Sequence, residues 1–271
     1  MNSCQKYFSA CLLALVSQAA FAQAPALGAA SAFSVLGGTA VTCTAPGVVT
    51  GDVGVSPGSA FTNTGCTIAG AMPPATNVAA AAAHNDLLIA YTALQSTPCT
   101  GTLLSTIPAS VTLAPGVYCT GATEALTATG VTLTLDAGGN AYAVWIFKTG
   151  AALTGTNFSV VMAGGGQPCN VFWVPSAAAT MTTSALKGNI VAGGATGSIT
   201  LTGGTLAGRA LANVAVTITG ANVIGCGALS STPVSCKKKH KHNGDRDDDD
   251  DDDDHGDHDK DREHERNKKD D

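Results

Sequence analysis

The sequence predicts a mainly β protein, and within that class a β-solenoid in which short strands stack in successive coils. Three observations carry this prediction. Apolar residues alternate with threonine over short runs such as Val131–Leu135 and Val214–Ile218, and clusters of glycine and asparagine separate the runs. A threonine-centred motif recurs through the second half of the chain. Residues 24–235 contain 33 threonines but only seven formally charged side chains, whereas about 25% of residues are charged in an average domain.

The recurring motif consists of an apolar residue, Thr, a small residue, any residue, a small or polar residue and a second apolar residue. It begins at Leu126, Leu153, Met181, Leu201 and Ile218, so that its threonines lie 27, 28, 20 and 17 residues apart. A repeat of roughly 20 residues that contains strands and glycines is typical of a β-solenoid. Inward columns of Leu, Val, Ile and Ala would then alternate with outward columns of Thr. A β-sandwich is the alternative, although we would expect more even turn spacing from it.

Residues 1–22 are predicted to be a secretory signal peptide. An apolar run from Phe8 to Val16 follows a short basic start, and the small-x-small pattern Ala20-Phe21-Ala22 precedes Gln23. The apolar run is shorter than the roughly 20 residues that a membrane span requires, and no other long apolar run follows it. We therefore disfavour an uncleaved anchor, and for the same reason a lipoprotein site at Cys11. The protein is expected to be secreted, with one domain over residues 23–236 and no membrane partner.

One segment interrupts the strand pattern and predicts an α-helix over residues from about 76 to 95. One face of this helix would be formed by Ala80, Ala83, Leu87, Ala90, Tyr91 and Leu94. Thr76 is a candidate N-cap, and Pro98 ends the pattern. A helix of this length spans about 28 Å, which equals about six coils at ~4.8 Å. We therefore expect it to lie along the solenoid and cover one apolar side, with the loop from Asn63 to Pro74 as the cap of one end.

Seven cysteines remain after the signal peptide, and export favours disulfides. Pairing of sequence neighbours would join Cys43 to Cys66, Cys99 to Cys119 and Cys226 to Cys236, and would leave Cys169 free, but spacing alone does not decide the connectivity. No Cys-x-x-Cys occurs, and residues 23–236 hold a single histidine, His84, which we expect to be an ordinary helix residue. We therefore predict no metal site and no cofactor.

Residues 237–271 form a tail with 10 basic and 16 acidic residues, including the unbroken run Asp247–Asp254, and so hold the whole net charge of −6. Because the tail has no apolar residues to bury, we predict that it is disordered. Three roles stay open for it: a solvating appendage, loose binding of divalent cations by the clustered carboxylates with His255 and His258, and attachment to a basic partner. The run lacks the spaced ligands and turn glycine of a calcium loop.

Seven short blocks between residues 26 and 226 follow one another in a specific order: Leu27–Gly37, Val49–Gly58, Leu113–Tyr118, Ala143–Phe147, Cys169–Trp173, Gly188–Ile190 and Gly208–Leu211. In sequence and in order they resemble the DUF3494 family of ice-binding-like proteins. The resemblance implies a discontinuous right-handed β-solenoid of roughly triangular section with one long flanking α-helix. It also implies an ice-binding role for one flat face.

Some members of that family carry a Thr-(Ala/Gly)-x-(Thr/Asn) motif on the ice-binding face. The segments that begin at Thr120, Thr154, Thr202 and Thr219 match it, whereas those at Thr127 and Thr182 depart from it. By this resemblance the predicted ice-binding residues are Thr120, Thr123, Thr154, Asn157, Thr182, Thr202, Thr205, Thr219 and Asn222. The competing interpretation is that threonine is simply a favourable outward residue in a strand.

A neutral face of methyl and hydroxyl groups suits the implied role, because charged groups would orient water around themselves instead of leaving an ice-like layer. The leading hypothesis is a secreted antifreeze or recrystallisation-inhibiting protein whose partner is ice or ordered water. The alternative is an extracellular adhesion or matrix module with a charged tail and no ice activity. We do not expect an enzyme, because the acids Asp52, Asp86, Glu124 and Asp136 are isolated from one another. No phosphate loop or basic aromatic patch indicates a nucleic-acid partner.

Overall fold

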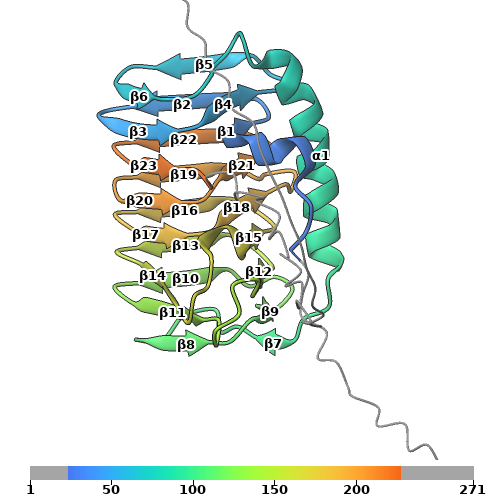
Figure 1. Ribbon diagram of the computed structural model, residues 1–271, viewed down its shortest axis with the longest axis vertical. Helices are drawn as coiled ribbons and strands as arrows, with labels where there is room; N and C mark the ends of the chain where they lie inside the picture. The colour runs from blue at the N-terminus through green and yellow to red at the C-terminus, as the bar shows by residue number, and fades with distance from the viewer. Residues whose placement is uncertain (1–23, 227–271) are drawn as a thin grey trace, which may run out of the picture. The chain divides into compact units, whose positions relative to one another are not determined.

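A computed structural model of the chain describes residues 24–226; the predicted signal peptide and the charged tail lie outside this range. The described residues form three parallel β-sheets, two 3-10 helices (η1, Gly28–Ala32, and η2, Pro168–Asn170) and one α-helix. Consecutive strands belong to different sheets, so the chain winds in coils, and each full coil adds one strand to each sheet (Figure 1). The mainly β, solenoid fold predicted from the sequence is confirmed.

The three sheets run the length of the stack, and each is described here in spatial order. Sheet A contains β4 (Asp52–Val55), β1 (Phe33–Gly37), β21 (Ala210–Ala212), β18 (Asn189–Ala192), β15 (Val171–Pro175), β12 (Trp145–Thr149), β9 (Gly116–Cys119) and β7 (Gly101–Thr102). Sheet B contains β10 (Leu126–Thr129), β13 (Leu153–Thr156), β16 (Ala179–Thr182), β19 (Ile199–Thr202), β22 (Ala215–Thr219), β2 (Ala40–Thr44) and β5 (Ala60–Asn63). Sheet C contains β6 (Cys66–Ile68), β3 (Gly47–Thr50), β23 (Asn222–Ile224), β20 (Thr205–Ala207), β17 (Ala185–Lys187), β14 (Ser159–Ala163), β11 (Thr132–Asp136) and β8 (Val111–Leu113).

The spatial order of the coils differs from their order in the sequence. Strands β1, β2 and β3 at the start of the chain pair in parallel with β21, β22 and β23 at its end. The coil of β4, β5 and β6 lies outermost on that side, and the chain then reaches the opposite end of the stack through α1 (Figure 1). The solenoid is therefore discontinuous. The coil that comes first in the sequence packs against the coil that comes last, so the paired residues lie near opposite ends of the described sequence.

The interior of the coils forms one hydrophobic cluster. Side chains alternate between the two faces of a strand, so every second residue points inward. The largest fully buried side chains include Trp145, Phe147, Phe158 and Trp173. The Phe147 ring stacks between the rings of Tyr118 and Trp173, with centroids 5.7 Å and 4.3 Å away. Burial of each such side chain stabilises the fold by about 1.5–3 kcal/mol.

Helix α1 (Asn77–Ser96) lies along the outer face of sheet A, where the sequence predicted it (Figure 1). Its buried residues are Ala80, Ala83, His84, Leu87, Ala90 and Leu94. They pack against outward residues of sheet A, among them Leu36, Phe172 and Leu211, in a second hydrophobic cluster. The alanines permit close approach, so β1 and β15 are buried along their whole length. The residues of β15 accordingly form a continuous apolar run.

The two ends of α1 are fixed by contacts that the sequence did not predict. Thr76 occupies the N-cap position, but its hydroxyl donates to the Val53 carbonyl at 2.8 Å instead of accepting from the helix, so the predicted N-cap hydrogen bond is absent. At the other end Lys148 Nζ donates to the carbonyl oxygens of Gln95 and Thr97 at 2.8 Å and 2.7 Å. Burial lowers the pKa of Lys148, while the helix C-terminus favours its charged form.

Three disulfides hold the described residues: Cys43–Cys66, Cys99–Cys119 and Cys169–Cys226, with Cα separations of 5.9 Å, 5.9 Å and 5.6 Å. The first two agree with pairing of sequence neighbours. The third corrects it, because neighbour pairing left Cys169 free and joined Cys226 to Cys236, which lies outside the described residues. Cys169 precedes β15 and Cys226 follows β23, so coil stacking brings them together despite a sequence separation of 57 residues.

The predicted cap at Asn63–Pro74 is wrong in part. Cys66–Ile68 is strand β6, which pairs with β3 and belongs to the outermost coil of sheet C. Ala71, farther along, holds the chain against β4: its amide donates to Asp52 Oδ1 at 2.9 Å and its carbonyl accepts from Val53 N at 2.8 Å. The segment therefore extends the solenoid before it turns into α1. Among residues 24–226 no helix combines the length and apolar content of a membrane span.

Candidate functional site

The outer face of sheet B presents threonine at two positions in almost every strand, and parallel pairing aligns these positions from coil to coil. The first column contains Thr106, Thr127, Thr154, Thr180, Thr200, Thr217, Thr42 and Thr62. The second column contains Thr129, Thr156, Thr182, Thr202, Thr219 and Thr44. We call these residues together the threonine array.

Strand geometry explains why the array is regular. In β10, Leu126 and Ala128 point into the core with no exposed surface, while Thr127 and Thr129 point outward. The neighbouring strands repeat this alternation without a register shift. Parallel strands lie about 4.8 Å apart and two residues along a strand span about 6.6 Å. The threonines therefore occupy a grid with two unequal repeats at right angles.

The array is uncharged and open to solvent. None of the strands of sheet B contains Asp, Glu, Lys, Arg or His. Within residues 24–226, the one side-chain hydrogen bond that the array forms joins the hydroxyls of Thr44 and Thr219 at 3.2 Å. The other hydroxyls, each beside a γ-methyl group, face outward and can bond water. Such a surface can order water but offers no group for acid–base chemistry.

Comparisons with known proteins agree with the fold. The sequence model of the ice-binding-like family matches residues 35–224. The chain belongs to the ice-binding-like family. It is 38% identical over 219 residues to an ice-binding protein of Nostoc sp. (strain HG1), a match that covers 77% of this chain and 79% of that protein. It is 32% identical over 208 residues to an ice-binding protein of Flavobacterium frigoris (strain PS1), covering 71% of this chain and 73% of the relative.

Solved structures agree as well. The crystal structure of an ice-binding protein from an Antarctic biological consortium superimposes with a TM-score of 0.68 at 31% identity, covering 76% of this chain and 92% of that one. The members that the chain matches are ice-binding proteins and not enzymes. Residues 24–226 likewise contain no group of three or more His, Cys, Asp or Glu that could hold a metal ion.

The residues predicted for ice binding fall in four places of this ice-binding-like fold. Thr154 lies in the first column, and Thr182, Thr202 and Thr219 lie in the second. Asn157 follows β13 at the corner between sheets B and C. Thr205 and Asn222 are paired neighbours on sheet C. Thr120 and Thr123 lie in the connection between β9 and β10. The structure thus brings four of the nine onto the outer face of sheet B.

Several of the other five make contacts within the protein. Asn222 Oδ1 accepts from Val48 N at 3.0 Å, and Asn157 Oδ1 accepts from the hydroxyl of Thr183. Thr120 Oγ1 donates to the Glu124 carbonyl at 2.8 Å and accepts from Gly150 N at 3.0 Å. These side chains hold corners and turns, so fewer of their hydrogen-bonding groups are available to an external lattice.

The corner between sheets B and C explains the small residues of the motif. One residue after β2, β10, β13, β16, β19 and β22 has a positive φ: Ala45, Gly130, Asn157, Thr183, Gly203 and Gly220, with φ between 47° and 66°. Glycine and asparagine adopt this left-handed conformation most easily. Asn157, Gly203 and Gly220 of the motif are therefore set by the turn of the coil, whereas Gly155 lies within β13.

The sequence prediction missed ten members of the array. They are Thr42, Thr44, Thr62, Thr106, Thr127, Thr129, Thr156, Thr180, Thr200 and Thr217. A simpler signal marks most of them: the tripeptide Thr-x-Thr occurs once in each of β2, β10, β13, β16, β19 and β22. Because side chains alternate along a strand, both threonines of such a tripeptide share one face.

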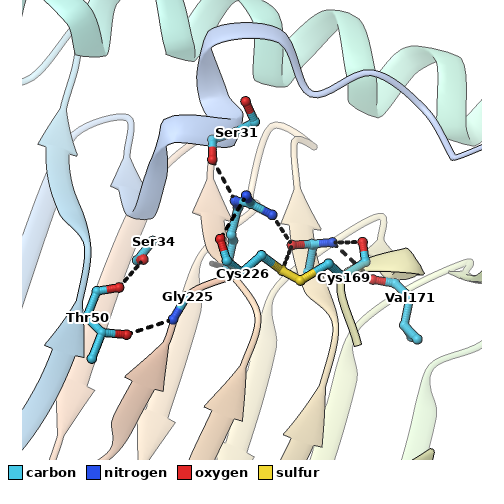
Figure 2. Close-up of a disulfide and its surroundings, with 9 residues drawn as sticks. Ser31, Ser34, Thr50, Cys169, Val171, Gly225 and Cys226 are labelled. Atoms are coloured by element: carbon cyan, nitrogen blue, oxygen red, sulfur yellow. Dashed lines mark hydrogen bonds between the residues drawn. A yellow bond between two sulfur atoms is a disulfide. The ribbon is translucent and has the colours of Figure 1, made fainter. Parts of the chain in front are cut away.

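The array crosses the break in the chain, where β22 pairs with β2. A polar cluster lies at the same break on another side of the coils, at the corner between sheets C and A, where β20 leads into β21. Arg209 Nε donates to the Ser31 carbonyl at 2.9 Å, and Nη1 donates to Asn189 Oδ1 at 3.1 Å. Asn189 is fully buried, and its Nδ2 donates to the carbonyl of Cys169 at 2.9 Å. Figure 2 shows this cluster around the Cys169–Cys226 disulfide. Burial lowers the pKa of Arg209. The cluster links η1, at the start of the chain, to β18 and to the end of the last coil.

Proposed function

We propose that this protein is a secreted ice-binding protein that adsorbs to ice through the threonine array and so slows ice growth or recrystallisation. The observation that carries the proposal is the alignment of outward threonines in two columns over the length of sheet B. Membership of the ice-binding-like family supports it. Thr154, Thr182, Thr202 and Thr219 keep the role predicted from the sequence, and the other members of the array join them.

The chemistry of the array suits adsorption to frozen water. A γ-methyl group beside each hydroxyl leaves water few ways to orient, so a layer of ordered water can form over the columns and merge with an ice plane. No charged group of sheet B competes for that water. Because the array is carried by hydrogen-bonded ladders and a close-packed core, little conformational entropy is lost on adsorption. Many weak contacts made at once then hold the protein on the ice.

Secretion is part of the proposal. The signal-like pattern of residues 1–22 supports it, and so do the three disulfides, because disulfides persist in oxidising compartments. Expression with residues 1–22 in a secreting host should release a protein whose N-terminal residue is Gln23. Retention of the full chain inside the cell would contradict this part of the proposal.

An ice-affinity experiment tests the central claim. Mature protein is expected to enter a slowly growing ice front and to shape ice crystals in a cooled droplet. Thr154→Tyr with Thr202→Tyr should require about tenfold more protein for the same shaping, which corresponds to about 1.4 kcal/mol of lost binding. The matched control is Thr67→Tyr with Thr132→Tyr on exposed positions of sheet C, which should behave as the parent protein. Exclusion of the parent protein from ice would refute the proposal.

A further inference from the structure

We propose that a cleft between the C-terminal half of α1 and the corner of sheets A and B binds a neutral sugar, either free or as one unit of an extracellular polysaccharide. The cleft has a volume of about 390 Å³, which lies within the usual range for small-molecule sites. It contains no member of the threonine array. The inference goes beyond the proposed function, because it adds a second ligand that is bound away from the array and without ice.

Polar groups on both sides of the cleft have hydrogen-bonding capacity to spare. Helix α1 supplies Tyr91 and Gln95. The coils supply Lys148, near the end of β12, and Ser176, directly after β15. Gln95 Nε2 donates to the Tyr91 hydroxyl at 3.2 Å, so the Tyr91 proton can be donated to a ligand. Among residues 24–226, neither Gln95 Oε1 nor the Ser176 hydroxyl has a hydrogen-bond partner. Together these groups can donate and accept hydrogen bonds within one cleft.

The electrostatics of the cleft favour a neutral ligand. Lys148 Nζ already donates to the carbonyl oxygens of Gln95 and Thr97 at 2.8 Å and 2.7 Å. These carbonyls belong to the C-terminal end of α1, whose dipole equals about half a negative elementary charge and opposes the binding of an anion. The lining contains no Asp or Glu that would attract a cation. The third Nζ proton of Lys148 can still donate to a hydroxyl group of a neutral ligand.

Tyr91 gives the cleft a rigid apolar wall. A β-carbon on Gly193 would lie 2.4 Å from Tyr91 Cγ, so the ring packs directly on the backbone there and is held in place. The Cys99–Cys119 disulfide forms another part of the wall. A tyrosine presents an apolar ring with a polar tip, and a pyranose has a face of C–H groups edged by hydroxyls. The wall and the polar groups around it therefore match a sugar, and the fixed side chains limit the entropy lost on binding.

Thr120 belongs to this site. The sequence predicted it as an ice-binding residue, but it lies outside the threonine array and lines the cleft. Its hydroxyl donates to the Glu124 carbonyl at 2.8 Å and accepts from Gly150 N at 3.0 Å, so it holds the wall of the cleft in place. Because the array is not part of the cleft, a protein that adsorbs to ice would still be able to hold a sugar there.

Calorimetric titration of the mature protein tests the inference without ice. The probes are the methyl glycosides of glucose, galactose and mannose, and the neutral polysaccharide dextran. At least one of them should bind with a Kd of about 1 mM or tighter. Tighter binding of dextran per glucose unit than of methyl glucoside would identify a polysaccharide as the source, and equal binding a free sugar. No binding of any probe at about 10 mM would overturn the inference.

A charged analogue tests the preference for a neutral ligand. For the glycoside that binds, the matched probe is its methyl uronoside, which carries a carboxylate in place of the hydroxymethyl group. It should bind more weakly, because the C-terminal end of α1 opposes an anion. Tighter binding of the uronoside would show that the cleft is an anion site and would overturn the inference.

A pair of variants ties the binding to the cleft. Tyr91→Phe with Ser176→Ala removes two hydroxyls from the cleft and keeps the aromatic ring, so the Kd for the bound sugar should rise about tenfold. The matched control is Thr92→Ala with Ser96→Ala, which removes two exposed hydroxyls of α1 outside the cleft and should keep the parent Kd. Equal melting temperatures verify that both variants fold, and ice shaping should stay at the parent level in both. A parent Kd in the variant with both cleft hydroxyls removed would also overturn the inference.

Discussion

Sheets B and C are built by the same coils from strands of similar length, yet their outer faces differ. On sheet B nearly every outward position is threonine. The outward positions of sheet C are Thr132, Ser159, Ala185, Thr205, Asn222, Val48 and Thr67 in one column and Thr112, Thr134, Val161, Lys187, Ala207, Ile224 and Thr50 in the other. Val161 and Ile224 are 44% and 48% exposed. Sheet C therefore shows that this fold tolerates polar, apolar and charged residues at the outward positions of a sheet.

This comparison weakens the interpretation that threonine is only a favourable strand residue. If strand propensity and solubility were the whole reason, the two sheets would have similar outer faces, because both form parallel ladders of the same coils. The uniformity of sheet B exceeds what the fold needs.

The largest effect on ice shaping is expected from a charge in the middle of the array. Thr200→Lys places an ammonium group between Thr180 and Thr217 of the first column. A compact, strongly hydrated cation holds its own water shell and would prevent the ordered layer from spanning its neighbours. Ice shaping should then require more than about tenfold higher protein concentration, or about 1.4 kcal/mol of lost adsorption.

Thr134→Lys is the matched change on sheet C, since Thr134 is an outward residue of β11. It should leave ice shaping unchanged, as measured with both proteins at equal concentration in the same cooled droplet assay. Equal losses from the two lysines would remove the distinction between the sheets. Unfolding in guanidinium serves as the check that neither variant is destabilised.

The next effect concerns the joint on which both sheets depend. Arg209→Gln removes the donors that reach Ser31 and Asn189, leaving the buried Asn189 Oδ1 short of a partner. Hydrogen bonds to a charged group contribute about 1.5–3 kcal/mol each, so the free energy of unfolding should fall by about 3 kcal/mol. Hydrogen exchange should quicken first in β1–β3 and β21–β23, on sheets B and C alike.

A double-mutant cycle sharpens this test. Thr42 and its neighbour Thr62 join the rest of the array through the pairing of β2 with β22. If the joint loosens in Arg209→Gln, the change Thr42→Tyr should cost less ice activity there than in the parent protein. Additive losses, together with unchanged exchange in β1–β3, would show that the cluster does not support the array.

A smaller effect is expected on the third side of the solenoid, which contributes to neither outer face. His84 lies on the buried face of α1, and its Nδ1 has no hydrogen-bond partner within the described residues. Burial lowers the pKa of His84 from the ordinary 6.5. The folded protein therefore disfavours the charged ring. Above the pKa that His84 has in the unfolded chain, the ring is neutral in both states and the free energy of unfolding is unaffected. As the pH falls below that value, protonation favours the unfolded chain and the free energy of unfolding decreases.

Unfolding measured at pH 8 and at pH 5.5 should show this decline, and His84→Leu should reduce it. The variant keeps an apolar side chain against sheet A and has no group to titrate. Ice shaping at the two pH values should stay the same while the protein is folded, because the array holds no titratable group. A pH dependence that is unchanged in the variant would assign the effect to other groups.

The sequence predicted the fold class and the helix well because both depend on local patterns. Alternation of apolar residues with threonine identifies strands, and the alanine-rich segment identifies α1. The pairing of Cys169 with Cys226 was not accessible, because it depends on how distant coils stack. The predicted N-cap hydrogen bond of α1 is absent because the Thr76 hydroxyl donates to a carbonyl of β4 instead.

The threonine array was predicted only in part, for a reason that strand geometry explains. The motif treated Thr154 and Thr182 as equivalent, whereas Thr154 pairs with Thr180 and lies in the other column. A shift of two residues keeps a side chain on the same face of a strand, so apolar and polar patterning cannot detect it. Because the coils differ in length, the spacing of threonines along the sequence does not reveal this two-residue shift. Only the pairing of strands determines which column a threonine belongs to.

The smallest effect is expected at the corner where sheets B and C meet. Ala45 has a φ of 62°, close to the values of Gly130, Gly203 and Gly220 at the same corner. The left-handed conformation costs a non-glycine residue about 1–2 kcal/mol, and glycine loses about 0.5–1 kcal/mol of backbone entropy in return. Ala45→Gly should therefore stabilise the protein by about 0.5–1 kcal/mol, measured by guanidinium unfolding.

Gly220→Ala is the reciprocal control. A β-carbon at Gly220 would have its nearest neighbour, the Pro46 carbonyl oxygen, 3.9 Å away, so the substitution adds backbone strain without a clash. It should destabilise the protein by about 1 kcal/mol, the usual cost of a left-handed alanine. Neither position belongs to the array, so ice shaping should remain at the parent level in both variants. A change in ice activity at constant stability would mean that the corner itself takes part in adsorption, and the boundary between the two faces would have to be moved from the end of sheet B onto the turn.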